Sequence, residues 1–226
     1  MLSIMSRFER IPEFYSGSIK ILVAITTCHT RPEQAPLQRR LWTHRVKDAD
    51  YKFFYGRGEN REPLPDEIFF NCSDSYDGLT DKARMIYHWA WDHDYDYIYD
   101  CDDDTYVIPE RLLESGFAEW DYIGRQRGAD GEFPDDYASG GAGVWISRKA
   151  LQILVAAPPT DDTVDDRWLG DTLRKNGIIC HRDQRYCLAR EWKKYAANLI
   201  SCETTRHDLG READMDEVHR VCWGNK

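Results

Sequence analysis

The sequence predicts an α/β fold in which helices flank a mixed, mostly parallel β-sheet. Short apolar runs rich in β-branched and aromatic residues alternate along the chain with stretches that have helical spacing. The connections are short, and no internal repeat or low-complexity linker interrupts this order. We therefore expect residues 1–226 to form one domain, with an N-terminal extension at 1–18 and a less regular C-terminal segment at 181–226.

The first third of the chain contains three predicted strands and one predicted helix. A run of β-branched apolar residues at 19–27 predicts a buried first strand. A loop with Pro32 follows, and residues 37–46 have the spacing of a helix. Aromatic residues at 51–55 and 67–70 predict the second and third strands.

The strongest helix prediction covers residues 79–92. Its apolar side chains fall on one stripe, as expected for a helix that packs on a sheet. The stripe consists of Leu79, Ala83, Ile86, Tyr87 and Ala90. An aromatic strand is predicted next at 95–99, and a proline begins a further helix at 109–114.

The second half continues the alternation. Strands are predicted at 120–124 and 144–147, and helices at 148–156 and 167–176, where prolines and a glycine respectively provide the stop signals. Residues 124–137 are polar and contain glycine and proline, so we expect a mobile loop there.

The formal net charge of -10 argues against binding to nucleic acid through a broad basic surface. No apolar run reaches the ~18 residues needed to cross a membrane, and the charged N-terminus does not have the pattern of a signal peptide. We therefore expect a cytoplasmic or otherwise soluble protein. A lumenal catalytic domain trimmed of its targeting segment stays open.

The seven cysteines are scattered and form no CxxC pair. This usage favours reduced, structural thiols. A disulfide stays open among the four cysteines nearest the C-terminus, which are Cys180, Cys187, Cys202 and Cys222.

Three consecutive carboxylates, Asp102, Asp103 and Asp104, follow the aromatic strand. Unpaired, they would repel one another and raise their own pKa values. A divalent cation removes that repulsion, and carboxylate oxygens suit Mg²⁺ or Mn²⁺. The segment therefore indicates a metal site, the alternative being an acidic loop that only begins a turn.

Two other segments are expected near these carboxylates. Ligands bind parallel sheets at the carboxyl ends of the strands, where Thr26 and Thr27 follow the first strand. Three glycines, Gly140, Gly141 and Gly143, precede the strand at 144–147 and let the backbone pass close to a ligand. The alternative for the glycines is a flexible turn.

A second acidic patch lies at 161–166. Asp165 or Asp166 can cap the following helix, and the other carboxylate can act as a general base for a hydroxyl nucleophile. His207 is a further candidate metal ligand, although a lone histidine is more often structural or exposed. Lys82 can reach a phosphate, although a solvated position is the ordinary one.

These segments together resemble the Fringe and β1,3-galactosyltransferase group of inverting glycosyltransferases, which have the single-domain, Rossmann-like GT-A fold. The likeness extends over about residues 19–180, and all its segments occur in the family's order. The matching segments are 21–27 with 38–42, 79–85, 97–107 (the DxD strand), 137–150 (the glycine segment) and 164–170. Cys101 departs from the family, which has Thr or Ser before the carboxylates.

The resemblance implies Mn²⁺ (or Mg²⁺) and a nucleotide-sugar donor, usually a UDP-sugar. It implies that Asp104 binds the metal directly, that Asp102 faces the ribose or a metal-bound water, and that His207 is the C-terminal metal ligand. It further implies that Asp166 is the general base, with Asp165 as its substitute.

The resemblance also assigns the donor's binding residues. Thr26, Thr27 and Arg39 would hold the nucleotide, Lys82 would lie on the donor side, and Asp103 would lie between the two DxD carboxylates. The glycines Gly140, Gly141 and Gly143 would line the sugar pocket. The loop at 124–137 would close over the donor and limit its hydrolysis.

The implied activity is therefore direct transfer of a sugar to an acceptor hydroxyl, with inversion. The acceptor stays open among a glycan, a protein, a small molecule and a hydroxymethylated DNA base. The chain lacks the membrane anchor and stem of the Golgi enzymes, which favours a bacterial, phage or viral source. Two alternatives to this hexosyltransferase remain: an inactive binding or scaffold protein that kept the fold, and a metal-dependent nucleotidyltransferase or phosphohydrolase.

Overall fold

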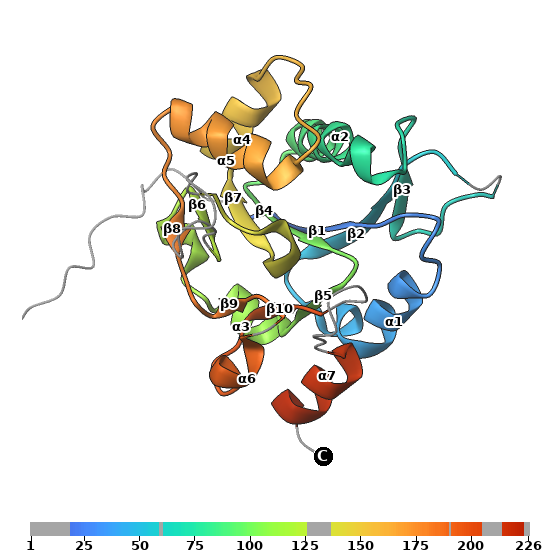
Figure 1. Ribbon diagram of the computed structural model, residues 1–226, viewed down its shortest axis with the longest axis vertical. Coiled ribbons are helices and arrows are strands. Elements are labelled where there is room, and N and C mark those ends of the chain that lie inside the picture. The colour runs from blue at the N-terminus through green and yellow to red at the C-terminus, as the bar shows by residue number, and fades with distance from the viewer. Residues whose placement is uncertain (1–18, 59–60, 126–136, 190, 205–213, 224–226) are drawn as a thin grey trace, which may run out of the picture.

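The computed structural model describes residues 19–58, 61–125, 137–189, 191–204 and 214–223. Within these ranges a seven-stranded sheet forms the centre of the molecule (Figure 1). In spatial order its strands are β3 (Glu67–Phe69), β2 (Asp50–Tyr55), β1 (Ile21–Thr26), β4 (Tyr97–Asp102), β7 (Val144–Ser147), β6 (Tyr122–Gly124) and β8 (His181–Arg182).

Strand direction confirms a mixed, mostly parallel sheet. β1 pairs in parallel with both β2 and β4, β2 with β3, and β6 with β8. β7 alone runs antiparallel, between β4 and β6. Because β7 is reversed, its first residues lie at the same edge of the sheet as the last residues of β1 and β4. The glycines before β7 therefore reach the carboxyl edge predicted for the ligand site.

Three helices cover one face of the sheet (Figure 1). They are α2 (Leu79–Asp92), α4 (Arg148–Ala156) and α5 (Asp165–Lys175), and they pack on one another. Leu22 and Ala24 of β1 face this layer, while Val23 and Ile25 face the opposite one. All four side chains are fully buried. Burial on both faces explains the continuous apolar run that predicted this strand.

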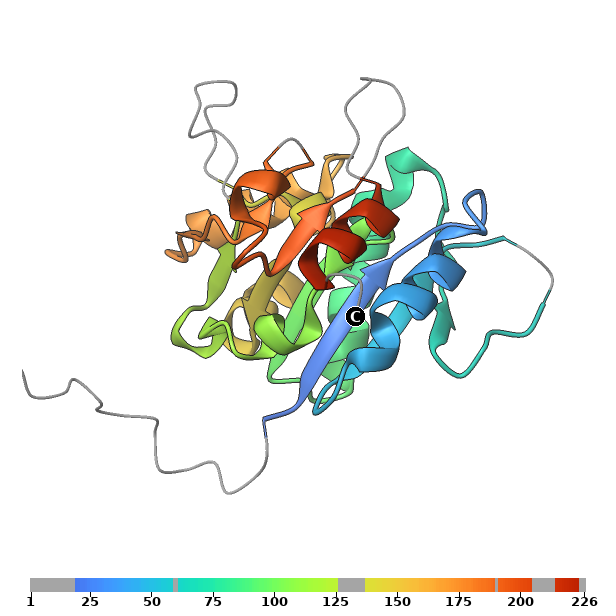
Figure 2. The same cartoon turned by 90° about the horizontal axis from the view of Figure 1, so that it is seen from below.

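A second, smaller sheet covers the other face together with helices (Figure 2). Its order is β5 (Thr105–Val107), β10 (Ser201–Glu203) and β9 (Tyr186–Cys187). The helices of this layer are α1 (Gln34–Leu41), α3 (Pro109–Leu113), α6 (Trp192–Tyr195) and α7 (Met215–Trp223). Four single 3₁₀ turns complete the described elements: η1 (Thr43–Arg45), η2 (Tyr76–Gly78), η3 (Phe117–Glu119) and η4 (Gly140–Ala142).

The predicted bounds hold best for the long helices. The helices at 79–92 and 148–156 are confirmed over their full lengths. The first helix begins at Gln34, before the predicted residue 37, and ends at Leu41, after which a 3₁₀ turn continues to Arg45. The N-terminal extension and residues 126–136 of the predicted loop lie outside the described residues.

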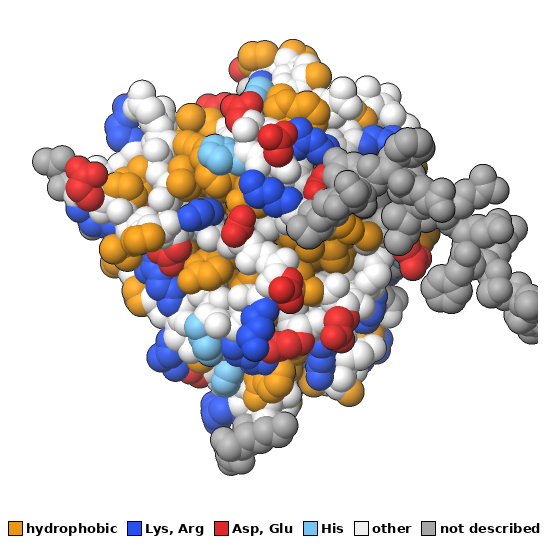
Figure 3. All heavy atoms as spheres, turned by 180° about the vertical axis from the view of Figure 1, so that it is seen from behind, with side chains coloured by type: hydrophobic (Ala, Val, Ile, Leu, Met, Phe, Trp, Pro, Cys, Tyr) orange, Lys and Arg blue, Asp and Glu red, His pale blue; other side chains and the backbone are white. Residues whose placement is uncertain are grey.

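The surface agrees with the composition. On the face shown in Figure 3, the described acidic and basic side chains are interspersed, without a broad basic area. All seven cysteines fall within the described ranges and are free, so no C-terminal disulfide forms. In the described part of the chain, every helix is too short or too polar to span a lipid bilayer.

Candidate functional site

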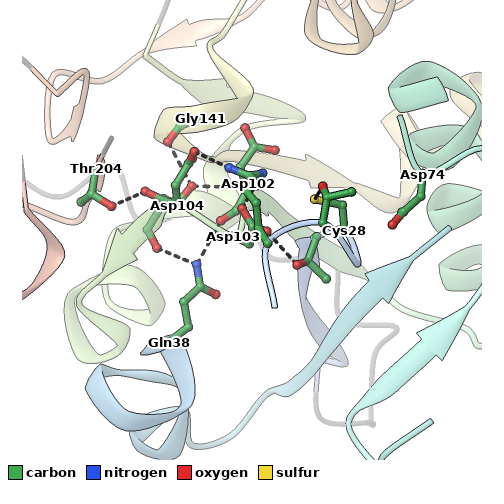
Figure 4. A network of polar contacts seen from close by, with 12 residues as sticks. Cys28, Gln38, Asp74, Asp102, Asp103, Asp104, Gly141 and Thr204 are labelled. Atoms are coloured by element: carbon green, nitrogen blue, oxygen red, sulfur yellow. Dashed lines mark hydrogen bonds and ion pairs between the residues drawn. The ribbon is translucent and has the colours of Figure 1, made fainter. Parts of the chain in front are cut away.

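The three carboxylates form a tight turn where the chain passes from the large sheet to the small one. β4 ends at Asp102, and β5 begins at Thr105. We call Asp102, Asp103 and Asp104 the acidic turn. The Thr105 hydroxyl accepts the Asp102 N–H at 3.1 Å and donates to the Gly141 carbonyl at 3.0 Å. One hydroxyl thus joins the acidic turn to the glycine segment (Figure 4).

Segments remote in sequence hold the backbone of the acidic turn. The buried Gln38 of α1 donates through Nε2 to the Asp102 carbonyl at 3.2 Å and to the Thr105 carbonyl at 3.3 Å. From the C-terminal side, Thr204 donates its N–H to the Asp104 carbonyl at 2.7 Å (Figure 4). The turn is therefore fixed from both sides, which keeps its carboxylates in a defined arrangement.

The end of β1 holds Asp103 in place. Thr26 lies opposite Asp102 in the parallel register, and its carbonyl accepts the Asp103 N–H at 2.9 Å. The Thr27 hydroxyl donates to Asp103 Oδ2 at 2.7 Å, and Arg31 pairs with Asp103 Oδ1 at 2.7 Å. The structure thus brings Thr26 and Thr27 to the acidic turn as predicted. Asp103 is fully buried and is committed to these contacts.

The acidic turn carries more negative charge than its surroundings balance. Desolvation, the neighbouring Asp104 and then Asp165 raise the pKa of Asp102 well above its usual value. Burial raises the pKa of Asp103 to about 7, against the opposing effect of Arg31. A cation beside Asp102 and Asp104 would relieve this repulsion.

The donor set fits a hard divalent cation in chemistry but supplies only part of a coordination shell. Asp102 and Asp104 offer carboxylate oxygens at one turn, as Mg²⁺ and Mn²⁺ prefer. Among the described residues, no group of three His, Cys, Asp or Glu side chains is arranged to hold a metal ion. The predicted third ligand, His207, lies outside the described residues. Two carboxylates with open positions for water and phosphate are typical of magnesium-type sites.

The glycine segment lies directly beside the acidic turn. Gly140 begins η4, and a Cβ added to Gly141 would lie 3.4 Å from Glu203 of β10. Gly143 has φ +82°, and a Cβ there would lie 1.8 Å from the Tyr99 hydroxyl. Gly143 is therefore required for close packing on β4, while the Gly140 N–H contacts Asp166 and the Gly141 carbonyl contacts Thr105.

We expect Gly143→Ala to unfold the protein at lower denaturant than a matched variant, Gly177→Ala. Both glycines have φ +82°, but an added methyl group at Gly177 meets nothing within 4 Å. Positive φ costs an alanine about 1–3 kcal/mol at either position, and at Gly143, whose ψ is 145°, the backbone lies close to a region that essentially only glycine occupies. Overpacking against Tyr99 adds about 1–3 kcal/mol at Gly143 only. Urea denaturation measures the difference. Equal losses in the two variants would show that the contact with Tyr99 is accommodated.

The helix after the second acidic patch begins earlier than predicted. α5 starts at Asp165, and its N-cap residue is Val164, which makes no side-chain cap bond. The expectation that Asp165 or Asp166 is the N-cap is therefore wrong: both lie in the first turn, where the helix dipole favours negative charge.

Asp165 and Asp166 have distinct neighbours. The charge of Asp165 contributes to the raised pKa values of Asp102 and of Asp100, the latter raised to about 7 mainly by desolvation. The Asp166 carboxylate accepts a long 3.5 Å hydrogen bond from the Gly140 N–H. The structure therefore brings both to the edge that holds the acidic turn and the glycine segment.

Lys82 and Arg39 have protein partners. Lys82 is 1% exposed and donates to the Thr27 carbonyl at 2.7 Å and to Asp74 at 2.6 Å. Its ammonium supports the loop that carries Thr27. Arg39 forms ion pairs with Asp66 and Glu67, which do not belong to the acidic turn.

Several residues of the site carried no signal in the sequence. Arg31 lies in the loop between β1 and α1, where its charge looked like that of an ordinary surface residue. Glu203 ends a three-residue strand that is too short to predict, and Thr204 follows it. Tyr87 was predicted only as part of the apolar stripe of its helix, but its hydroxyl donates a hydrogen bond to Asp100 at 2.6 Å.

Comparisons with known proteins agree on the fold. No family model matches the chain, and no curated protein matches its sequence. The mannosyltransferase PcManGT from Pyrobaculum calidifontis, solved with GDP-Man and Mn²⁺, aligns over 74% of this chain and 55% of its own, with 12% identity and a TM-score of 0.51. The apo-form glycosyltransferase GlyE of Streptococcus pneumoniae TIGR4 aligns over 91% and 60%, with 10% identity and a TM-score of 0.53.

A third structure matches nearly end to end. It is a glycosyltransferase involved in glycosylation of the major capsid of PBCV-1, aligned over 89% of this chain and 98% of its own, with 15% identity and a TM-score of 0.50. This chain spans little more than half the length of the first two proteins. At these identities the likeness establishes the fold, which is that of glycosyltransferase enzymes, as the GT-A resemblance implied.

Proposed function

We propose that this protein is a metal-dependent inverting glycosyltransferase that moves a sugar from a nucleotide-sugar donor to an acceptor hydroxyl. The observation that carries this proposal is the meeting of the acidic turn, the glycine segment and the first turn of α5 at one edge of a glycosyltransferase fold. We further propose, from the resemblance, that the chain acts as one catalytic domain of the Fringe-like group.

The three residues of the acidic turn have different roles in this proposal. Asp102 and Asp104 would hold Mn²⁺ or Mg²⁺, with His207 as the proposed third ligand. The bound cation would stabilise negative charge on the leaving diphosphate as a Lewis acid. Asp103 positions the turn through Thr27 and Arg31. Thr26 and Thr27 then shape the nucleotide side of the site, with Lys82 behind them.

The acidic start of α5 supplies the base. In our proposal, Asp166 takes the proton of the acceptor hydroxyl as its oxygen forms a bond to the anomeric carbon, while the bond from that carbon to the diphosphate oxygen breaks. A single displacement of this kind inverts the anomeric centre. Asp165 is the alternative base, although its interaction with Asp102 favours a role in setting the charge of the acidic turn.

The donor is proposed to be a UDP-sugar, on the resemblance alone. The Pyrobaculum mannosyltransferase was solved with GDP-Man and Mn²⁺, so a GDP-sugar is the competing donor class. Arg39 remains a proposed nucleotide ligand that would have to leave Asp66 or share its contact. The acceptor stays open among a glycan, a protein, a small molecule and a modified DNA base.

A thermal-shift panel of UDP-, GDP-, CMP- and dTDP-sugars, each with Mn²⁺ and with EDTA, tests the proposal. We expect one nucleotide class to raise the melting temperature with Mn²⁺ and to lose its effect in EDTA. A hundredfold excess over Kd stabilises the folded state by about 2.7 kcal/mol, which is readily measured. Measuring the sugar-free nucleotide that is released when acceptors are added then distinguishes an enzyme from an inactive binding protein. Shifts unaffected by EDTA would contradict the metal role.

A further inference from the structure

Arg31 joins two carboxylates of the acidic turn. Its Nη2 lies 2.7 Å from Asp103 Oδ1, and its Nη1 lies 3.1 Å from Asp104 Oδ2. Arg31 belongs to the loop between β1 and α1, more than seventy residues away in sequence. Its guanidinium therefore lies between two carboxylates whose mutual repulsion a bound cation would also reduce.

The two halves of this contact differ. The Asp103 side chain is fully buried, and the Thr27 hydroxyl holds its second oxygen at 2.7 Å. The Asp104 side chain is 14% exposed and Arg31 itself 35% exposed, so this half of the contact faces outward. The contact with Asp103 is an ion pair without hydrogen-bond geometry, whereas Arg31 donates a hydrogen bond to Asp104. Because Asp104 is the more accessible of the two carboxylates, Arg31 can give up that hydrogen bond while its ion pair with the buried Asp103 remains.

We propose that Arg31 is an internal counter-ion that competes with the divalent cation for Asp104 and, once displaced, donates to the donor's diphosphate while still paired with Asp103. This inference rests on the proposed function for its donor half. The competition half concerns only the acidic turn and the cation.

Charge and geometry support both halves. Arginine cannot lose its proton in a protein, so a cation that binds Asp104 at coordination distance repels the nearby guanidinium. The N–H groups of Nη1, which contact Asp104 in this structure, would then be released beside the bound cation. The planar fork of the guanidinium matches phosphate oxygens, with charge-assisted hydrogen bonds stronger than neutral ones. Because Arg31 would remain paired with Asp103, its N–H groups would already lie close to the donor's diphosphate.

The first test measures Mn²⁺ binding without nucleotide, by the electron paramagnetic resonance signal of free Mn²⁺. We expect Arg31→Gln to bind Mn²⁺ about two- to fivefold more tightly than wild type, the range for removing one partly exposed competing charge. Arg31→Lys, which keeps the charge but cannot span both carboxylates, should lie between the two. Arg174→Gln, which removes an equal charge from the exposed pair with Asp171, should leave Mn²⁺ affinity unchanged.

The second test uses UDP and GDP as probes at saturating Mn²⁺, with Kd measured by calorimetry. We expect Arg31→Gln to bind the nucleotide preferred by wild type about tenfold more weakly, the loss of one charge-assisted contact. The same substitution thus strengthens metal binding and weakens diphosphate binding. A purely structural role for Arg31 would weaken both, because the turn itself would be disturbed.

The outcomes separate this inference from the proposed function. Unchanged or weaker Mn²⁺ binding by a folded Arg31→Gln variant overturns the competition. Tighter Mn²⁺ binding with unchanged nucleotide affinity overturns the donor half alone. If wild type binds Mn²⁺ but neither nucleotide, the donor class proposed above fails together with the donor half, and the Mn²⁺ result still decides the competition. If neither wild type nor Arg31→Gln binds Mn²⁺, both proposals fall.

Discussion

Asp104→Asn is expected to lower the rate of sugar transfer about a thousandfold or more, because the cation proposed at the acidic turn would supply several kcal/mol of transition-state stabilisation. The side chain is accessible at 14% exposure, and its backbone is fixed through Thr204, so the amide would occupy the same position. Mn²⁺-dependent donor binding should be lost together with turnover. Initial rates of nucleotide release and the Mn²⁺-dependent thermal shift measure the two effects.

Metal-free Asp104→Asn should remain folded. The substitution loses a contact with Arg31, but it also removes a like charge that raises the pKa of Asp102. The matched control is Asp92→Asn, which removes an exposed carboxylate at the end of α2 and should keep wild-type rates. Normal transfer by Asp104→Asn would remove this residue from the metal site.

Asp166→Asn is expected to separate donor binding from transfer. The amide can still accept a hydrogen bond from the Gly140 N–H, so the glycine segment and donor affinity should be preserved. It cannot take the acceptor proton, and loss of a positioned general base costs about 10²- to 10⁴-fold in rate. Donor Kd and single-turnover rates, measured on the same preparation, give the two quantities.

Two neighbouring carboxylates serve as references for this result. Asp165→Asn should alter Mn²⁺ affinity more than the proton-transfer step, because its charge bears on Asp102. Asp161→Asn lies in the same acidic patch but is exposed, and it should behave as wild type. If Asp165→Asn lost transfer while Asp166→Asn kept it, the base would be Asp165.

The sequence predicted those parts of the fold whose causes are local. β1 is recognisable because its side chains are buried on both faces, and α2 because its apolar stripe packs on the sheet. For the three carboxylates the sequence predicted a metal site, with a turn as the alternative. The structure places them at a turn between β4 and β5, and the metal site stays a prediction. Their position at the carboxyl edge then followed from the rule for parallel strands.

What the sequence did not predict depends on contacts between distant residues. β9 and β10 have two and three residues, too few for a periodic pattern, and they form because β10 pairs with both β9 and β5. The ion pairs of Arg31 with Asp103 and of Lys82 with Asp74 could not be predicted, because only the folded chain brings these side chains together. The start of α5 at Asp165 was missed because no side chain caps it.

The clamp between Thr204 and Asp104 joins residues one hundred positions apart. During synthesis, the strands of the central sheet as far as β7 therefore leave the ribosome well before the segment that secures the acidic turn. A nascent chain ending before residue 201 has β5 without its partner β10. Non-local pairing of this kind forms late and slowly. The arrangement of the acidic turn is thus tied to synthesis of the chain as far as residue 204, and a shorter nascent chain carries the three carboxylates without the contact from Thr204 that holds their backbone.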